Sequence, residues 1–497
     1  MRSNVVFVVL LLLLGGLVAG LVMRAPETHE APIAATAEPL PAASASGAPA
    51  DTGAVASASA TVSASASAAP APPPPPPMDR PLRVMGLGWE LVAPGVMANG
   101  GVVPGSGSFY EKQRLDVVIA ASQDASKVEN ALARGGKDPE GADIAILPLP
   151  RFVASYERLK ALHPVIFFVV GYSDGREVVL SNKGGFDKLP RQGKLELDAA
   201  PGSAAAFLAL YAFDLAGVNV DRVDLTSKDA PFRALTRRQS KAASEQVKGD
   251  VLLTTGEAAG LIPHVAIAQT GLVESHPAAL TAWAEGWLEG QRIVASDASE
   301  AARTIAKAKG APEPLTVLAD LGTIRPASLA DCAHATGLSG RGAATLEKLF
   351  EESWRIWREA KILSVPPERA PVDGSIVASL VRAGAPLDPP ATSKVPDQAP
   401  TKSDDAPLIT HRIRADELDV DAVVEELGTI AGVFPRSPLV ITVHPAVRGR
   451  IAADAKETKA VIDRALERFD LPPARLRAGK ATGVTGTVAT VAIMPVP

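Results

Sequence analysis

The stretches LRVMGLGW (82–89), LDVVIAASQDASKVENALARG (115–135) and ADIAILPLP (142–150) decide the fold class of this chain. Each contains a short apolar run rich in Val, Ile and Leu, which is typical of a buried strand. In the middle stretch Asp124 caps a helix with apolar residues at helical spacing, and Gly135 ends it. Strand, helix and strand in this order predict an α/β protein with a parallel sheet, whose ligands bind at the carboxyl ends of strands.

A second α/β alternation follows the stretch PVIFFVVGYSDGREVVLSN (164–182), in which two apolar runs are separated by Ser173-Asp174-Gly175. That arrangement predicts a hinge. The expected second lobe has a helix from Ser203 through Leu215 and strands at 194–198, 223–226 and 250–254. Two such lobes in series predict a cleft between them.

Length and composition limit the organisation and the class of function. A chain of 497 residues holds about three domains or fewer at roughly 150 residues each. The net charge of -5, without a long basic run, argues against a nucleic-acid partner. The single cysteine, Cys332, excludes an intrachain disulfide and a Cys-rich metal site.

Motifs for catalysis are absent from the sequence. It contains no Walker loop, no G-x-S-x-G, no H-E-x-x-H and no complete G-x-G-x-x-G. Cys332 and His334 lie two residues apart and share no helix face, so they are not expected to form a nucleophile and base. We therefore predict no enzyme, no metal site and no cofactor.

The N-terminal region predicts a membrane segment followed by a spacer. Residues 5–23 form an uncharged apolar run between Arg2 and Arg24, long enough to span a bilayer. Residues 1–24 are therefore either a transmembrane anchor or a cleaved signal peptide, and both place the remaining chain outside the cytoplasm. Residues 25–78 are rich in Ala, Ser and Pro and predict a disordered linker.

The C-terminal region predicts a second linker and a small domain. We expect the large domain to cover 79–365, a linker to cover 366–407, and a βαβαβ domain of the α+β class to cover 408–497. The apolar run LVITVH (439–444) marks its central strand.

The large domain resembles a known family in the order and residue composition of its segments. These segments run from LRVMGLGW to LELDAAPGSAAAFLALYAFDLAGVNVDRVDLTS (195–227) and DVLLTTGEAA (250–259). It is similar to the periplasmic solute-binding proteins of nitrate, sulfonate, taurine and thiamine-precursor ABC importers. The resemblance implies a two-lobe periplasmic-binding-protein fold, a small-molecule ligand between the lobes, and ABC permease subunits as partners. It departs from the family at the glycine-rich insert 99–108.

With this resemblance, the loops that follow the strands become candidate ligand contacts. Pro201-Gly202-Ser203 opens a helix whose free amides suit an anionic group, although Ser203 is equally explained as an ordinary helix cap. Trp89 is expected either to stack on a flat ligand or to pack at the lobe rim. The predicted ligand-binding residues are Trp89, Ser122, Gln123, Pro148, Gly202, Ser203, Thr254 and Thr255.

The C-terminal domain resembles, in VVEELGTIAGVFPRSPLVITVH (423–444) and KAVIDRALERFDLPPARLRAGKATG (459–483), the OmpA-like peptidoglycan-binding module. In that family an aspartate and an arginine hold the wall peptide. Here Pro445 follows His444, and Glu457 stands where the arginine is expected. A carboxylate repels the peptide's carboxylate, so a docking or structural role is preferred over wall binding.

The sequence thus predicts a membrane-tethered periplasmic solute-binding protein of an ABC-type importer, with an anionic or zwitterionic solute between its lobes. The alternative is an envelope structural or peptidoglycan-associated protein with a vestigial receptor domain. The fold is also shared by thiamine-precursor synthases, but their pocket is rich in His and Cys, which this chain lacks. The predicted location is the inner membrane with the bulk in the periplasm, or the periplasm after cleavage.

Overall fold

The computed structural model describes residues 76–190, 192–225, 230–239, 249–339, 344–365, 368–387, 406–444, 453–480 and 485–496. The chain divides into two compact units, Met1–Pro72 and Pro73–Pro497, and all of these residues belong to the second. The predicted N-terminal anchor at 1–24 lies outside them. Within these ranges, no helix combines the length and apolarity needed to cross a bilayer.

Lobe 1 is built on a six-stranded sheet of order β11-β4-β10-β3-β1-β2. Its strands are β1 (Leu82–Leu87), β2 (Val117–Ser122), β3 (Ile144–Pro148), β4 (Pro164–Ser173), β10 (Pro263–Gln269) and β11 (Ile324–Pro326). β1 runs parallel to β2 and β3, while β10 is antiparallel to both β3 and β4. The carboxyl ends of β1 to β4 therefore meet at one edge of the sheet, beside the start of β10.

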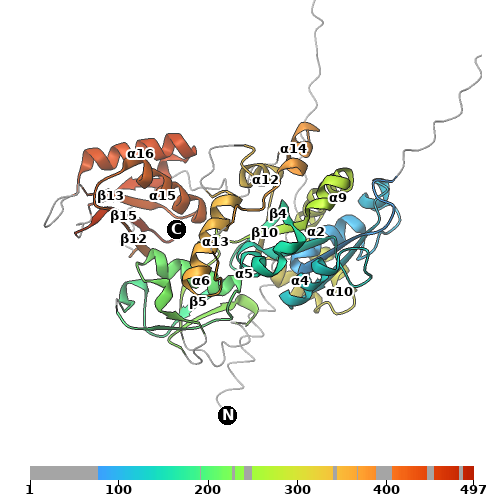
Figure 1. The fold of residues 1–497 in the computed structure, drawn as a ribbon, viewed down its shortest axis with the longest axis horizontal. Coiled ribbons are helices and arrows are strands. Elements are labelled where there is room, and N and C mark those ends of the chain that lie inside the picture. Colours follow the sequence, from blue (N-terminus) through green and yellow to red (C-terminus); the bar gives the residue numbers. More distant parts are fainter. Residues whose placement is uncertain are drawn as a thin grey trace, which may run out of the picture. The chain divides into compact units, whose positions relative to one another are not determined.

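Helices α2 (Trp89–Asn99) and α9 (Pro277–Ser296) cross closely in lobe 1 (Figure 1). Glycines make this approach possible, because a Cβ at Gly290 would clash with the Pro94 carbonyl and one at Gly95 would lie 2.9 Å from Trp287. Trp89, which we expected in the loop after the first strand, instead begins α2, and Glu90 follows it in the first turn. The other helices that pack around this lobe are α3 (Phe109–Lys112), α4 (Ala125–Arg134), α5 (Leu149–Leu159), α8 (Thr270–Ser275), α10 (Ala298–Ala306), α11 (Pro314–Leu321) and α12 (Leu329–Ala335).

Lobe 2 has a five-stranded sheet of order β7-β6-β8-β5-β9 and the buried helix α6 (Ala204–Leu215). Its strands are β5 (Glu177–Ser181), β6 (Leu195–Asp198), β7 (Val223–Asp224), β8 (Phe232–Thr236) and β9 (Asp250–Thr254). β6 runs parallel to β7 and β8, while β5 is antiparallel to β8 and β9.

The two sheets repeat one topology. In lobe 1, the strand that arrives from lobe 2, β10, inserts antiparallel between β3 and β4. In lobe 2, the strand that arrives from lobe 1, β5, inserts in the same manner between β8 and β9. Two segments connect the lobes: 174–176, here crossing 1, and 255–262, here crossing 2. The predicted two-lobe α/β fold is confirmed, and crossing 1 follows Ser173 as expected for the hinge.

Helix α13 (Leu346–Glu359) packs against both lobes through an apolar stripe that includes Phe350, Trp354 and Trp357. The Trp357 indole N–H donates to the Pro150 carbonyl at the start of α5 (2.8 Å), and its ring lies 5.7 Å from that of Phe207 in α6. Tyr156 of α5 contacts Trp354 edge to face.

The body of the protein extends into the segment that we predicted as a linker from residue 366. Helix α14 (Ser375–Arg382) buries Ile376, Val377 and Leu380 in the core. Just before it, the Ile166 amide of β4 donates to the Pro371 carbonyl at 2.7 Å. The prediction was wrong here because Pro366 and Pro367 read as a break, although apolar residues at helical spacing follow them.

The C-terminal module, residues 406–496, has a four-stranded sheet of order β12-β15-β13-β14. Its elements are β12 (Ile409–Arg414), α15 (Val420–Val433), β13 (Leu439–Val443), α16 (Ala455–Phe469), β14 (Leu476–Ala478) and β15 (Thr487–Ile493). The expected βαβαβ order is present, with one addition. The short β14, which the prediction missed, pairs in parallel with β13.

Candidate functional site

A cluster of buried charges lies where crossing 1 leaves lobe 1. The Arg176 guanidinium, whose side chain is 12% exposed, forms an ion pair with the Glu90 carboxylate (2.7 Å) and a longer one with Glu177 (3.7 Å). Glu90 belongs to the first turn of α2 in lobe 1, and Glu177 begins β5 in lobe 2. Arg176 thus bridges carboxylates from both lobes.

Crossing 2 contributes to the same cluster through Thr255. Its hydroxyl donates to the Glu177 carboxylate at 3.2 Å, and its amide donates to the Glu177 carbonyl at 3.0 Å. Burial raises the pKa of Glu177, while the Arg176 charge opposes that shift. The two crossings therefore meet at this one carboxyl group.

His264, the second residue of β10, is completely buried beside the cluster and contacts the Ser173 hydroxyl through Nε2 at 3.0 Å. Burial lowers the pKa of His264 well below its usual value, and the Arg176 charge lowers it further. The imidazole is therefore neutral at pH 7.

Two buried nitrogen atoms of this cluster have no hydrogen-bond partner, namely Nη1 of Arg176 and Nδ1 of His264. An unpaired buried polar atom costs about 1–3 kcal/mol, so such atoms in native proteins need an explanation. A polar group of a ligand at this edge would satisfy them. Because two carboxylates, Glu90 and Glu177, lie beside the single Arg176 guanidinium and His264 is neutral, the cluster has no excess positive charge.

The C-terminal module contacts both crossings. Arg436 forms a bidentate ion pair with Asp174 of crossing 1 (2.9 and 2.7 Å) and also donates to the Gly256 carbonyl (3.4 Å). The Gly260 amide in crossing 2 donates to the Val433 carbonyl at the end of α15 (3.0 Å). A Cβ at Gly260 would clash with the Gly432 carbonyl, so the two backbones are in close contact.

The predicted contacts of lobe 1 all lie at the carboxyl ends of its strands. Trp89 is buried at the start of α2, next to Glu90. Ser122 ends β2 and its carbonyl accepts from the Gly88 amide (2.9 Å), while Gln123 is exposed. Pro148 ends β3 opposite His264 in the sheet register. Trp89 and Pro148 thus border the charged cluster, whereas Ser122 and Gln123 follow the edge strand β2.

The predicted contacts of lobe 2 form two groups. Thr255 belongs to the charged cluster, and the neighbouring Thr254 binds the Glu257 carboxylate. Ser203 caps α6 by accepting from the Ala206 amide (3.1 Å). Gly202, with φ of +73°, faces α5 of lobe 1, since a Cβ there would lie 3.2 Å from Ala154 Cβ and 3.5 Å from Arg151 Nη1.

Sequence reasoning missed Glu90, Arg176, Glu177 and His264. One signal was available for two of them: the adjacent charges of Arg176 and Glu177 directly precede the apolar run VVL in a strand. A charged pair at the entrance to a buried strand is unusual and marks a position that needs buried partners. His264 gave no such signal, because it has no partner nearby in the sequence.

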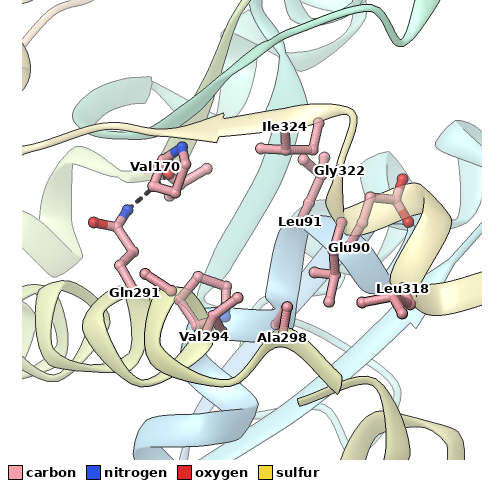
Figure 2. Close-up of a pocket in the computed structure, with 14 residues that line it drawn as sticks. Glu90, Leu91, Val170, Gln291, Val294, Ala298, Leu318, Gly322 and Ile324 are labelled. Carbon is pink, nitrogen blue, oxygen red and sulfur yellow. Dashed lines mark hydrogen bonds between the residues drawn. The ribbon is translucent and has the colours of Figure 1, made fainter. Parts of the chain in front are cut away.

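Lobe 1 has at least two cavities among its described residues, and none of the eight predicted residues lines these two. A cavity of about 420 Å³ is at the edge opposite the crossings, beside the Arg80–Asp143 ion pair (2.7 Å). The other, of about 310 Å³, lies behind Glu90 between α2, α9 and α11 (Figure 2). Within the described ranges no group of three or more His, Cys, Asp or Glu residues could hold a metal ion. Cys332 is buried, and burial raises the pKa of its thiol.

Neither a protein-family model nor a curated protein matches this chain. Solved structures do. One is the zinc-bound ligand binding component of an ABC-type import system from Staphylococcus aureus. Its sequence is 10% identical, the match covers 60% of this chain and 98% of that one, and the TM-score is 0.43. The periplasmic aliphatic sulphonate binding protein from Escherichia coli is 14% identical, covering 59% and 97%, TM-score 0.41. The periplasmic nitrate-binding protein from Synechocystis PCC 6803 is 14% identical, covering 59% and 92%, TM-score 0.41.

The last two of these proteins are of the kind that the sequence of the large domain resembles. The resemblance of the C-terminal module to OmpA-like proteins stays a prediction. His444 is buried, with Nε2 3.2 Å from the Thr490 hydroxyl, and residues 445–452, which follow it, lie outside the described ranges. Glu457 is placed in the first turn of α16.

Proposed function

We propose that this chain is a solute-binding protein of the cell envelope whose lobes close on a small anionic or zwitterionic molecule and deliver it to ABC permease subunits. One observation carries the proposal. Arg176, in a crossing between the lobes, is buried with Nη1 unpaired, at the edge where the carboxyl ends of β1 to β4 converge. Ligands of open α/β sheets bind at such edges.

The charges of the cluster favour a zwitterion over a simple anion. Arg176 is already neutralised by Glu90 at 2.7 Å, so an anion alone would leave the closed site with a net negative charge. A zwitterion brings both signs: its anionic group pairs with Arg176, and its cationic group with Glu90. Opening of the hinge frees these groups for exchange with the ligand.

A second anchoring point is proposed at the start of α6. The amides of its first turn and the positive end of the helix dipole favour an anionic group. Gly202 leaves space there, and Arg151 of lobe 1 faces the same point. The predicted contacts Trp89, Ser122, Gln123, Pro148, Ser203, Thr254 and Thr255 complete the proposed site at the two facing edges.

The N-terminal segments determine where the receptor works. An anchor at 1–24 and a spacer at 25–78 would tether the lobes to the periplasmic face of the inner membrane. A cleaved signal would release them into the periplasm instead. The proposal for the binding site holds in both cases.

The C-terminal module is proposed to dock on the hinge of its own chain. Arg436 pairs with crossing 1 and Val433 with crossing 2, so one rigid element contacts both segments that move when the lobes open. This favours a docking role over peptidoglycan binding, for which Glu457 has the wrong charge. The alternative is an envelope structural or peptidoglycan-associated protein in which the receptor domain is vestigial.

A thermal-shift screen of the full chain tests the receptor function. Sulfonates, nitrate, amino acids and pyrimidines are offered to the native protein and to Ser203→Ala. A ligand at about 100 times its dissociation constant should stabilise the native protein by about 2.7 kcal/mol. We expect amino-acid-like zwitterions to give the largest shift and Ser203→Ala to reduce it. A well-folded sample that responds to none of these classes would favour the structural alternative.

A further inference from the structure

The smaller cavity of lobe 1, about 310 Å³, lies between α2, α9, α11 and β11 (Figure 2). Its walls include Leu91 from α2, Val294 from α9, Leu318 from α11 and Ile324 from β11. A cavity of this size is at the lower end of the range for small-molecule sites. At roughly 30 Å³ for each water-sized group, it holds roughly ten non-hydrogen atoms.

Small residues leave this space open. Ala93, Ala295, Ala298 and Gly322 line the cavity, and each of them contributes at most one methyl group to its walls. Elsewhere α9 fills the core of the lobe with large side chains such as Trp287, which is completely buried. The space is therefore a property of these positions and does not come from loose packing of the helices as a whole.

The walls direct no charge into the cavity. Among the described residues that line it, only Glu90 and Gln291 have polar side chains. The Glu90 carboxylate pairs with Arg176 at 2.7 Å and lies against Gly88, where a Cβ would clash with it. The Gln291 amide N–H donates to the Val170 carbonyl at 3.0 Å, and Figure 2 shows the amide oxygen directed away from the cavity. The surface offered to a ligand is therefore mainly hydrocarbon.

Several apolar wall residues remain partly exposed to solvent. Val294, Leu318, Leu321 and Ile324 pack against the core of the lobe but are not fully buried. Exposed hydrocarbon gains free energy when it is removed from water, so a ligand that covers these side chains is stabilised by their burial. A polar molecule of the same size loses its hydrogen bonds to water and finds few partners in these walls.

We propose that this cavity binds a neutral apolar molecule of roughly ten non-hydrogen atoms, such as a short-chain alkylbenzene. The ligand is recognised by the hydrocarbon area that it buries, in contrast to the charged solute proposed for the interlobe edge. Affinity should therefore rise with each added methylene until the cavity is full, and it should not depend on salt. A full membrane acyl chain exceeds this capacity, so the occupant is a small free molecule and not a lipid.

Calorimetric titration of the full chain with toluene, ethylbenzene, propylbenzene, butylbenzene and hexylbenzene tests the capacity of the cavity. We expect the dissociation constant to fall about fourfold for each methylene up to butylbenzene, which reaches roughly ten non-hydrogen atoms. Hexylbenzene should gain less than about twofold over butylbenzene, and the values should agree at low and high salt. A steady gain through hexylbenzene, or no binding by any of these probes, would overturn the proposal.

Ala298→Phe places a ring in the cavity and should weaken the binding of butylbenzene by about tenfold or more. Because Ala298 is only partly buried, the larger side chain is accommodated without displacing the core. The matched control is Ala319→Phe on the exposed side of α11, which should leave the affinity unchanged. The apolar run 5–23 is the same in both variants, so binding of the probe to that run does not affect the comparison. Equal affinities of the two variants would contradict a site in this cavity.

Methyl NMR of the native protein locates the probe without a substitution. The methyl groups of Leu91, Val294 and Leu318 line the cavity and should shift on addition of butylbenzene. Those of Leu253, which is buried in lobe 2, should not. Shifts confined to other methyl groups would place the probe elsewhere and overturn the proposal.

Discussion

The two crossings between the lobes are held in place by different forces. Crossing 1 is short and charged: Asp174 pairs with Arg436, and Arg176 pairs with Glu90. Crossing 2 is longer and consists mainly of small or apolar residues, and the carboxyl-terminal part of this segment is buried. There Gly260 is in contact with the Gly432 backbone. The partners of an ion pair can instead be hydrated by water or bind the charges of a ligand, but close packing has no such substitute. In the proposed receptor, crossing 1 would therefore respond to the solute and crossing 2 would act as the pivot.

The largest effect is expected when the charge of crossing 1 is removed. Arg176→Met leaves Glu90 and Glu177 buried without their cation. Loss of one partner from a buried ion pair destabilises a protein by about 3–5 kcal/mol. Urea unfolding of the full chain at pH 7.5 measures the change in the free energy of unfolding.

Arg134→Met is the matched control, since the ion pair of Arg134 with Glu140 is solvent-exposed. That pair should contribute less than about 1 kcal/mol. If the two substitutions lower the free energy of unfolding equally, the ion pairs of crossing 1 do not stabilise the contact between the lobes. The difference between crossing 1 and crossing 2 would then disappear.

A smaller effect is expected when crossing 2 is made bulkier. Gly260→Ala places a methyl group against the Gly432 carbonyl, and Gly432 cannot retreat because a Cβ at its own position would lie 2.7 Å from Ala344 Cβ. Overpacking of this kind costs about 1–3 kcal/mol. We expect faster proteolysis between the body and the C-terminal module, because the strain is relieved when the module undocks.

Gly271→Ala in α8 is the control for the same substitution in open space, since no atom lies within 4 Å of a Cβ there. It should stabilise the protein slightly, as alanine does in a helix. Proteolysis of Gly260→Ala at the native rate would show that the module is not docked on crossing 2, and would leave only the Arg436 contact in support of the docking role.

The two-lobe fold could be predicted because it is encoded locally. Runs such as LDVVIA and ADIAIL alternate with a capped helix, and this order alone indicates a parallel sheet. Strand β10 escaped prediction, because PHVAIAQ is a short apolar run that fits a helix or a strand equally well. Its place between β3 and β4 is set by pairing with residues about a hundred positions earlier.

The candidate site was harder to predict than the fold for a related reason. The pattern Ser-Asp-Gly at 173–175 indicates an exposed turn, which is where Arg and Glu are ordinary. Arg176 is buried only because Glu90, from α2, lies beside it, and Glu177 because Thr255 does. The sequence contains these residues, but their chemistry depends on long-range contacts that periodicity does not encode.

The smallest effect is expected in the pH dependence of stability. It reports on the titration of His264 and not on the ion pairs of crossing 1. The pKa of His264 is lowered on folding, so its contribution to stability is complete above the unfolded pKa of about 6.5. This contribution is lost as pH falls from the unfolded pKa through the folded pKa, because in that interval the unfolded protein binds a proton that the folded protein does not. The slope from this group is about 1.4 kcal/mol per pH unit.

His264→Gln retains a polar group toward Ser173 and removes the titration. The pKa of Glu177 is raised, so its stabilising contribution is present at acid pH and lost as pH rises, opposite in sign to that of His264.

Urea unfolding of both proteins at intervals from pH 7.5 to 5.5 isolates the contribution of His264 as the difference between the slopes of their unfolding free energies with pH. We expect His264→Gln to lose less stability on acidification than the native protein. Parallel slopes would mean that His264 takes up its proton over the same pH range in the folded and the unfolded protein, and a neutral imidazole would then no longer support the preference for a zwitterion.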